Sequence, residues 1–299
     1  MLKLLFTGAS GFLGQNVKPL LEKKYEVKTM GLTEIDDFKT DLSKEIPEIP
    51  ETFDIVFHAA GKAHTVPNSD EEKKIFFNVN YQGTVNLCEA LEQSTLPKSF
   101  IFVSTVAVYG VEFGDNISEE HPLKGETPYA LSKIQAEHYL TEWCAKNNVK
   151  LGIIRPSLIA GPNAPGNLGA MVNGIKTGKY LSIGGGTARK SVLMVQDIAT
   201  LISLLVEKGG VYNVCDDEHP SFRELENIIS KQLVKNKPKT IPYFIAKAMA
   251  LVGNLLGTKA PINSLKLKKI TESLTFSNEK AKKELGWQPM NVLENYKIK

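Results

Sequence analysis

The chain has 299 residues, about twice the most common domain size, so one large α/β domain or two fused lobes fit it best. Hydrophobic residues make up 42% and charged residues 23%, which excludes wholesale disorder and a fibrous chain. The net charge is +3 without a long run of one sign, and the only arginines are Arg155, Arg189 and Arg223. Nucleic-acid-binding proteins use arginines to contact bases and phosphates, and this chain has few of them. We therefore expect no nucleic-acid partner.

The cysteines and the start of the chain indicate the compartment. Cys88, Cys144 and Cys215 are isolated and form no C-x-x-C pair, so neither a disulfide framework nor a cysteine metal site is predicted. The opening apolar run, Leu2–Phe6, is too short for a signal peptide and is soon followed by glycine. We therefore expect a reducing, cytoplasmic setting and no bound metal.

Short apolar runs alternate with helix-length amphipathic stretches along the first half of the chain. Strands are predicted at Leu2–Phe6, Tyr25–Met30, Phe53–Ala59, Phe100–Ser104 and Lys150–Ile154, and later at Gly210–Val214. Helices are predicted at Phe12–Lys24, Ile75–Glu92 and Tyr129–Lys146, and later at Phe222–Val234. This alternation predicts an α/β fold with a doubly wound parallel sheet.

After Pro156 the pattern changes to turn-rich segments at 161–167 and 184–186. We expect residues 1–156, completed by part of 190–216, to form the main sheet domain. Residues 157–299 are expected to supply most of a smaller, discontinuous C-terminal lobe.

The stretch Ile241–Gly257 raises the question of a membrane span. It is shorter than the ~20 residues that a bilayer core needs, and Lys247 and Asn254 interrupt it. We predict no transmembrane segment and favour a packed or partly exposed amphipathic helix. Contact with a membrane surface stays open, because hydropathy alone does not decide it.

A glycine loop, Thr7–Gly14, directly follows the first strand and opens the first helix. Its three glycines permit a tight turn, close approach to a pyrophosphate, and close packing of helix on strand. The N–H groups and positive dipole end of the new helix then bind the phosphates. This loop predicts a dinucleotide site built from Gly8, Ser10, Gly11, Phe12, Leu13 and Gly14.

The sequence leaves the choice of dinucleotide open. The acid expected near the end of the second strand, which would bind the ribose 2′-hydroxyl of NAD, is missing, and Gly31 stands about where it would be. No arginine is there to favour the 2′-phosphate of NADP, and Lys28 would serve only weakly. Further on, Asp41-Leu42 offers a carboxylate that either reaches the adenine or stands in a solvated loop.

Tyr129 and Lys133 place a phenol and an amine four residues apart on one face of a predicted helix. A free phenol has a pKa near ~10, and lowering it toward 7 takes roughly 4 kcal/mol. A nearby ammonium, the charge of a nicotinamide and a helix dipole are sources of that stabilisation. Ser104 and Thr105 end a strand at the sheet edge where open α/β folds place their chemistry, although they would also serve as caps.

With these motifs in this order, the chain resembles the extended short-chain dehydrogenases/reductases of the NAD-dependent epimerase/dehydratase family, which act on nucleotide sugars. The resemblance covers nearly the full length. It rests on Thr7–Gly14, His58–Gly61, Asn80–Thr84, Ser104–Gly110, Tyr129–Lys133, Arg155-Pro156, Gly161-Pro162, Asp197 and Leu285–Pro289. It implies a Rossmann domain with a substrate lobe, NAD or NADP as cofactor, and a homodimer formed through the 75–92 and 129–146 helices.

The resemblance also implies roles for single residues. Tyr129 is the catalytic acid/base, Lys133 binds the nicotinamide ribose and lowers the tyrosine pKa, and Thr105 binds the reacting oxygen. Further cofactor contacts are implied at Asp41, Leu42, Ala59, Ala60, Gly61, Asn80, Ser104 and Pro156. His58 is interpreted as a strand-end histidine close to the cofactor rather than a proton-transfer group.

For the substrate, the resemblance implies that Asn167 contacts the nucleotide diphosphate. Arg189 falls where a phosphate-binding arginine is usual, but counting back from Asp197 puts Lys190 in that place. Both cations are candidates, and an exposed basic pair without a ligand is the alternative.

The reaction is narrowed but not decided. Val106 and Ala107 stand where family dehydratases carry an acid pair, and alkyl side chains cannot move a proton, so a dehydratase is disfavoured. C4 epimerisation of a UDP-hexose or UDP-N-acetylhexosamine is the first hypothesis. Leu158 strengthens a second, the reduction of a UDP-linked 4-keto-6-deoxy-N-acetylhexosamine for surface polysaccharide synthesis. A dinucleotide sensor without catalysis is the third.

Overall fold

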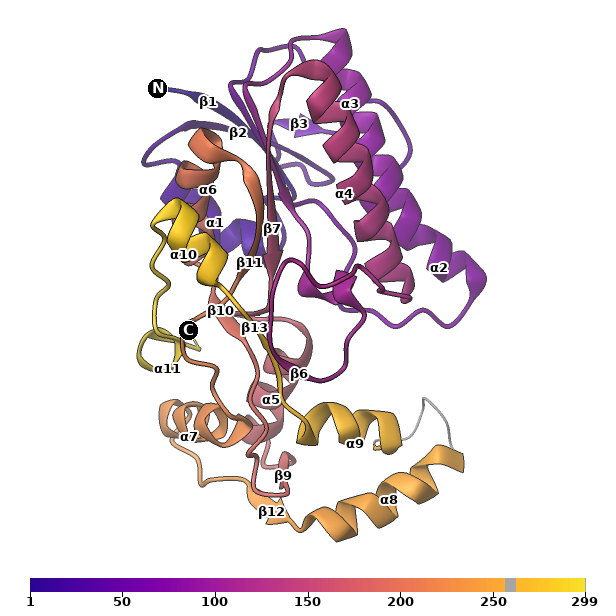
Figure 1. Cartoon of the computed structure of the whole chain (residues 1–299), viewed down its shortest axis with the longest axis vertical. Helices are drawn as coiled ribbons and strands as arrows, with labels where there is room; N and C mark the ends of the chain where they lie inside the picture. The colour runs from indigo at the N-terminus through magenta and orange to yellow at the C-terminus, as the bar shows by residue number, and fades with distance from the viewer. Residues whose placement is uncertain (256–261, 299) are drawn as a thin grey trace.

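The computed structural model describes residues 1–255 and 262–298. Its main sheet comprises β1 (Lys3–Thr7), β2 (Glu26–Gly31), β3 (Phe38–Lys39), β4 (Ile55–His58), β5 (Ser99–Val103), β7 (Lys150–Pro156) and β11 (Gly210–Val214). The strands run parallel in the order β11-β7-β5-β4-β1-β2-β3 (Figure 1). The predicted doubly wound parallel sheet is therefore confirmed.

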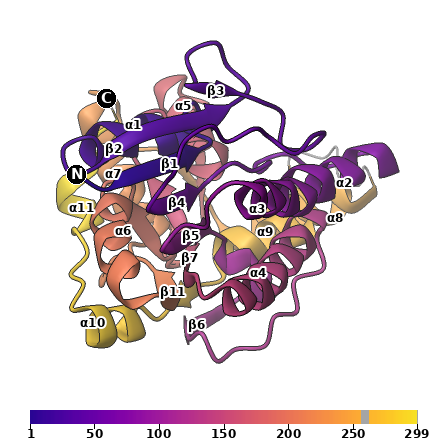
Figure 2. The same cartoon turned by 90° about the horizontal axis from the view of Figure 1, so that it is seen from above.

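Helices cover both faces of this sheet, which explains why the central strands carry apolar residues on both faces. Leu4 and Phe6 of β1 pack with α1 (Phe12–Leu21) and α6 (Asp197–Lys208). Leu5 belongs instead to the core formed with α3 (Gly83–Gln93) and α4 (Pro128–Asn147). Figure 2 shows these two helices on the side of the sheet opposite α6.

The predicted helix at Ile75–Glu92 begins earlier than its apolar periodicity suggests. The helical stretch starts at Asp70 with α2 (Asp70–Phe77), passes through one wide π-helical turn, η1 (Asn78–Gln82), and continues as α3. The Ser69 side chain accepts a hydrogen bond from the Glu72 N–H, and three acids stand in the first turn. A side-chain cap and a favourable dipole thus extend the helix over a polar segment that shows no hydrophobic pattern.

The order of the strands reverses between β1 and β4, and the carboxyl ends of the central strands meet at one edge. Open α/β folds bind their ligands at such a reversal. The turn after β1 is held to the neighbouring strand by the Gly8 N–H, which donates to the Met30 carbonyl at 3.2 Å. The glycine loop consequently lies at the edge that receives ligands.

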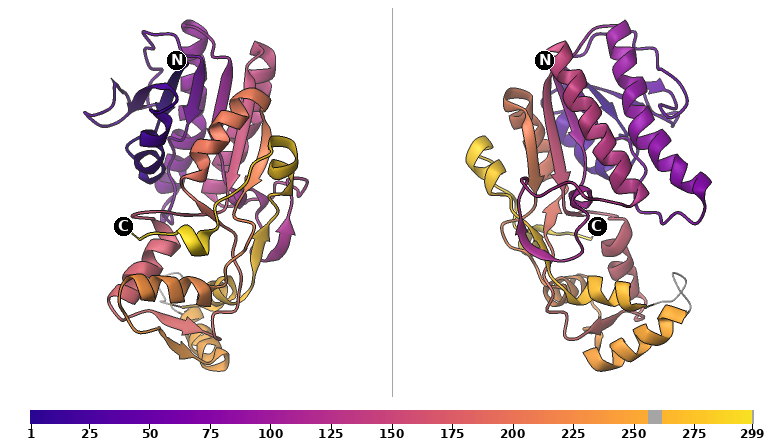
Figure 3. Two further views of the ribbon diagram at one scale, coloured as in Figure 1. Left: turned by 90° about the vertical axis from the view of Figure 1, so that its left-hand side faces the viewer. Right: turned by 45° about the vertical axis from the view of Figure 1, so that its right-hand side comes forward.

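Below this edge lies the smaller lobe, built from helices and short parallel strand pairs (Figures 1 and 3). Its helices include α5 (Gly166–Lys176), α7 (Phe222–Gln232), α8 (Tyr243–Leu255) and α9 (Ser264–Thr271). The pairs are β8 (Leu158–Ala160) with β10 (Val192–Met194), β9 (Leu181–Ile183) with β12 (Lys239–Ile241), and β6 (Gly114–Ile117) with β13 (Leu274–Phe276). The sequence did not predict these strands, because runs of three or four residues carry too little periodicity.

The end of the chain returns to the main domain. α10 (Glu279–Leu285) packs against β11 and α6, and α11 (Val292–Asn295) follows it. Two buried carboxylates hold this segment: Asp197 accepts from the Met290 N–H, and Asp216 accepts from the Val292 N–H at 2.7 Å. The lobe is therefore inserted between elements of the sheet domain rather than appended to it.

Within residues 1–255 and 262–298, no helix has the length and apolarity needed to cross a membrane. The apolar stretch predicted at Ile241–Gly257 forms α8 from Tyr243 to Leu255. Its predicted end at residues 256–257 lies outside the described part of the chain.

Candidate active site

Two glycines of the loop have no room for a side chain. Gly8 has φ +80°, and a Cβ there would lie 2.6 Å from the Ala60 nitrogen, while a Cβ on Gly14 would lie 2.3 Å from the Ala9 oxygen. Gly11 precedes α1 as its N-cap and supplies no side-chain cap. The N–H groups of the first turn of α1 are therefore left without a capping side chain at the ligand edge, an arrangement that fits a pyrophosphate.

The adjoining end of β4 is fixed by a buried histidine. His58 Nδ1 lies 2.6 Å from the Thr7 hydroxyl and Nε2 lies 3.0 Å from the Thr84 hydroxyl, and the Ala60 N–H donates to Thr7. Burial, with a smaller effect from Lys133, lowers the pKa of His58 to about 3. The ring stays neutral near pH 7, and its hydrogen bonds join the end of β4 to Thr7 and Thr84.

Asn80, carried inward by the π-helical turn, ties together three segments of the site. Its Oδ1 accepts from the Lys62 N–H at 2.7 Å, and its Nδ2 donates to the Lys62 carbonyl and to the Ser132 hydroxyl. A Cβ on Gly61 would lie 3.0 Å from Asn80 Oδ1 and 3.3 Å from Lys133 Nζ. The loop after β4, the π-helical turn and α4 thus converge on one point.

The predicted pair Tyr129 and Lys133 lies on one face of α4, which begins with a Thr127 side-chain cap and Pro128 in its first turn. Lys133 Nζ donates to the Val103 carbonyl at the end of β5 at 2.8 Å and lies 4.5 Å from the centre of the Phe102 ring. Burial lowers the pKa of Lys133 to about 8, against the opposing effect of the Glu137 carboxylate. With this pKa, the Lys133 side chain is still mostly charged near pH 7.

Thr105 and Tyr129 are brought together at the same edge. Thr105 caps a short 3₁₀ helix, η2 (Val106–Tyr109), and accepts from the Ala107 N–H at 3.1 Å. Burial raises the pKa of Tyr129, and a hydrogen bond with the Thr105 side chain opposes that rise. The predicted lowering by Lys133 is not seen in the protein alone, where burial dominates.

Beneath these groups lies a buried polar network that the sequence did not reveal. Glu137 accepts from the Ser104 hydroxyl and from Arg155, whose Nε lies 3.0 Å away. Arg155 also donates to the Tyr109 hydroxyl, which in turn donates to Asn213 at 2.6 Å. The only signal for Glu137 was its spacing, because it continues the stripe of Tyr129 and Lys133 by a further four residues.

As predicted, β2 ends at Gly31 and carries no acid there, but an acid from the following turn lies beside this position. The turn after β2 folds back, so that Asp36 Oδ2 lies 2.7 Å from the position of a Cβ on Gly31. This Oδ2 accepts from the Thr33 N–H at 3.0 Å and from its hydroxyl at 2.6 Å. A carboxylate therefore lies beside the end of β2, supplied by the turn rather than by the strand.

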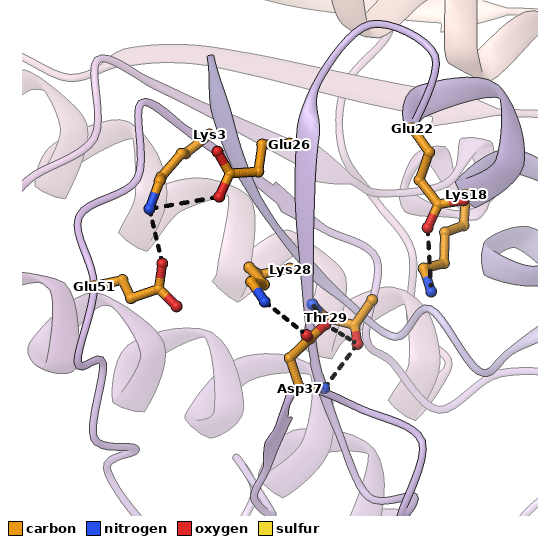
Figure 4. Close-up of polar contacts among 8 residues, drawn as sticks. All are labelled: Lys3, Lys18, Glu22, Glu26, Lys28, Thr29, Asp37 and Glu51. Atoms are coloured by element: carbon orange, nitrogen blue, oxygen red, sulfur yellow. Dashed lines mark hydrogen bonds and ion pairs between the residues drawn. The ribbon is translucent and has the colours of Figure 1, made fainter. Parts of the chain in front are cut away.

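Asp37, the next residue, pairs with Lys28, the lysine near the end of β2 that would favour NADP only weakly. Figure 4 shows its carboxylate between β2 and the turn, where it accepts from the Thr29 N–H at 2.9 Å and from Lys28 Nζ at 3.1 Å. These hydrogen bonds outweigh burial and lower the pKa of Asp37. Lys28 is thereby paired within the protein.

Asp41 is engaged in its own turn. It accepts from the Ser43 N–H and hydroxyl and pairs with Lys44 at 2.9 Å, contacts that lower its pKa. Leu42 is buried, and its carbonyl accepts from Asn86 Nδ2 at 2.7 Å. This geometry favours the loop interpretation of Asp41 over a reach to the adenine.

The lobe carries Asn167, one of the predicted substrate contacts, opposite the carboxyl edge of the sheet. Asn167 is exposed in the first turn of α5, directly after Gly166, whose φ is +64°. The ring of His64 fills the space where a Cβ on Gly166 would lie, at 2.9 Å from Nδ1. The loop after β4 consequently meets the start of α5, while Pro156 ends β7 as a buried residue.

Arg189 and Lys190 do not point to one place. The Arg189 guanidinium donates to the His219 carbonyl at 2.7 Å and lies 3.6 Å from the Glu224 carboxylate. Lys190 Nζ donates instead to the Glu272 carbonyl at 3.0 Å, and burial lowers its pKa. Alternation along an extended segment separates them, so one phosphate would not engage both.

Comparison with known proteins decides the family. Residues 4–215 match the model of the NAD dependent epimerase/dehydratase family. The chain belongs to this family. It is thus an enzyme of a family that uses NAD(P) on nucleotide sugars, and the resemblance predicted from its motifs is confirmed.

The relatives of this chain carry the names of more than one kind of enzyme. The chain is 28% identical to the N-acetyl-alpha-D-glucosaminyl-diphospho-ditrans,octacis-undecaprenol 4-epimerase of Escherichia coli O157:H7, covering 93% of this chain and 88% of the relative. It is also 28% identical to GDP-6-deoxy-D-mannose reductase of Pseudomonas aeruginosa, with 76% and 79% covered. Its fold matches UDP-glucose 4-epimerase of Thermotoga maritima, crystallised with UDP-glucose, at a TM-score of 0.75 and 21% identity over 99% and 96% of the two chains.

Proposed function

We propose that this protein is an NAD-dependent C4 epimerase of a UDP-hexose or a UDP-N-acetylhexosamine. The observation that carries the proposal is the meeting of Tyr129, Lys133 and Thr105 at the carboxyl edge, beside the glycine loop. When bound, the nicotinamide would accept a hydride from the sugar and return it. The protein's own groups have to bind, orient and move the proton.

In this proposal Tyr129 takes the proton of the sugar 4-hydroxyl and returns it when the 4-keto sugar has been reduced on its other face. Burial alone raises the pKa of Tyr129, which disfavours the ionised phenol. The Thr105 hydrogen bond acts against that rise. Charge contributed by Lys133 and by a bound pyridinium would complete the adjustment, since both favour a phenolate.

The end of β5 supports this over elimination of water. Val106 and Ala107 provide only alkyl side chains in η2, and the Ala107 N–H donates to the Thr105 hydroxyl. No second acid and base stand there to remove one proton and protonate a leaving hydroxide.

A reductase of a 4-keto-6-deoxy sugar is the second candidate. It requires the same Tyr129, Lys133 and Thr105, because the hydride chemistry belongs to the cofactor. Two observations favour keeping it: Leu158 begins β8 with an apolar side chain, and one relative carries a reductase name. The two candidates differ in whether a reduced dinucleotide is consumed.

Asp36 and Asp37 support NAD over NADP. A carboxylate over Gly31 accepts a ribose hydroxyl but repels a 2′-phosphate, and Lys28 is already paired with Asp37. On the substrate side we propose Asn167 and Lys190 as contacts of the nucleotide diphosphate. Arg189, bound to His219 and Glu224, is the weaker candidate.

The deciding experiment incubates the purified protein with a panel of UDP-hexoses and UDP-4-keto sugars, with NAD, NADH and NADPH supplied separately, and follows the sugars by NMR. An epimerase converts a UDP-hexose to its C4 epimer without added reduced cofactor. A reductase converts only a 4-keto sugar and consumes NADPH or NADH stoichiometrically. Tight dinucleotide binding without turnover of any sugar would leave the sensor hypothesis and overturn the proposal.

A further inference from the structure

Helix α8 turns its large apolar side chains away from the protein. Its inner face carries Ala246, Ala250 and Gly253, which are buried, and the two alanines pack with Leu267 of α9. On the opposite face Phe244, Leu251 and Leu255 are 72%, 58% and 88% exposed. These three follow one stripe, at spacings of seven and four residues. A globular helix normally buries its large side chains and exposes small or polar ones, and α8 does the reverse.

The apolar surface extends beyond this stripe. Ile245, Met249 and Val252 of α8 are also exposed, and so is Leu265 at the start of α9. Both helices lie at the end of the lobe farthest from the amino terminus (Figures 1 and 3). Contiguous exposed apolar surface of this kind marks an interaction site.

The stretch of sequence that contains α8 carries charge of one sign. Between Glu226 and Glu272 the sequence carries nine lysines and no acid, in a chain whose net charge is only +3. Lys235, Lys239 and Lys247 are exposed and form no ion pair within residues 1–255 and 262–298. Two lysines of α9 are paired, Lys268 with Glu272 and Lys269 with Glu112.

We propose that α8, together with the exposed lysines Lys239 and Lys247, docks on the surface of an anionic lipid bilayer. An apolar helix face beside a lysine-rich surround is the pattern of helices that lie in a membrane interface. The helix has 13 residues, too few to cross the ~30 Å hydrocarbon core, so it lies on the bilayer rather than spanning it. A second copy of this chain would bring the same positive charge to the contact, which disfavours self-association and favours lipid phosphates.

The test is flotation of the purified full-length protein with vesicles of phosphatidylglycerol mixed with phosphatidylcholine, or of phosphatidylcholine alone. The wild type is expected to float with the anionic vesicles, and high salt is expected to weaken that binding. Replacing Phe244, Leu251 and Leu255 by Ser together should reduce binding at least about tenfold. A Lys239→Gln, Lys247→Gln variant should bind about fivefold more weakly per lysine removed.

The matched control is Leu32→Ser, Ile35→Ser, which removes two exposed apolar side chains from the turn after β2, 65% and 83% exposed. It should float like the wild type. Binding that is equal for both vesicle types, or unchanged in the triple serine variant, overturns the proposal. If the wild type does not float and the triple variant instead loses self-association in analytical ultracentrifugation, the face is an interface between copies and the proposal is wrong.

Discussion

The sheet domain and the lobe hold their polar side chains in different ways. At the carboxyl edge of the sheet, Ser104, Lys133 and Glu137 are buried and bonded to partners from other elements. In the lobe, Asn167 is exposed, and Arg189 is exposed although its guanidinium contacts His219 and Glu224. Under the proposed function, the proton-transfer groups are held in place by buried partners, whereas the proposed diphosphate contact Asn167 lies on the surface.

The largest loss of activity is expected from a change among the buried groups of the sheet domain. Tyr129→Phe should lower turnover by at least ~100-fold, because an acid/base group is lost, while dinucleotide affinity stays nearly unchanged. Steady-state kinetics on the sugar and titration with the dinucleotide measure the two quantities. Tyr139→Phe removes another phenol from α4 and serves as the control, with little expected effect. Full turnover in Tyr129→Phe would remove this residue from the mechanism.

Glu137→Gln tests whether the buried network supports the chemistry. Arg155 would lose its buried counter-charge, and the free energy of unfolding should fall by about 3 kcal/mol. Because the Glu137 carboxylate raises the pKa of Lys133, its removal should lower that pKa below about 8. The charged ammonium is then lost at lower pH, so the alkaline limb of kcat/KM for the sugar should move to lower pH.

The control for this change is Glu142→Gln, an exposed acid on the same helix. Thermal unfolding and the pH profile should both match the wild type. An alkaline limb that stays in place in Glu137→Gln would show that Lys133 does not set it.

Asn167→Ala tests whether the exposed side chains of the lobe bind the substrate. If the lobe recognises the nucleotide diphosphate, KM for the sugar nucleotide should rise about tenfold, the loss of roughly one charge-assisted hydrogen bond. The dinucleotide affinity and the unfolding temperature should not change, since the side chain is exposed. Equal KM in variant and wild type would place the diphosphate elsewhere.

Asp36→Asn should give a smaller effect, confined to the cofactor. Removing the negative charge over Gly31 should raise the ratio of NADP to NAD affinity about fivefold, since the repulsion of a 2′-phosphate is relieved. Fluorescence titration with both dinucleotides measures the ratio. Asp115→Asn, an exposed acid of β6, is the control. An unchanged ratio would mean that Asp36 does not face the ribose.

Local patterns were sufficient to predict the frame of the molecule. The central strands and α4 follow from apolar runs and helical periodicity, and the glycine loop lies where its spacing predicted. The sequence did not predict the contact of Asp36 with Gly31, because it depends on the conformation of a turn that no periodicity encodes. Glu137 and Arg155 pair across 18 residues of sequence, a contact that only the packing of α4 on β7 creates.

The lobe was less predictable for a related reason. Its strands are short and pair with distant segments, such as β6 with β13, so no single stretch carries the signal. The outward face of α8 was equally hidden, because hydropathy shows an apolar stretch but not the direction in which it points.

The most direct test follows the near-ultraviolet absorbance of reduced nicotinamide after the protein and NAD are mixed rapidly with each UDP-hexose. If Tyr129 takes the proton of the sugar 4-hydroxyl as proposed, at least one UDP-hexose produces a transient rise that Tyr129→Phe suppresses. A protein that binds NAD tightly but gives no rise with any UDP-hexose, and no fall of NADH with any 4-keto sugar, would contradict the account.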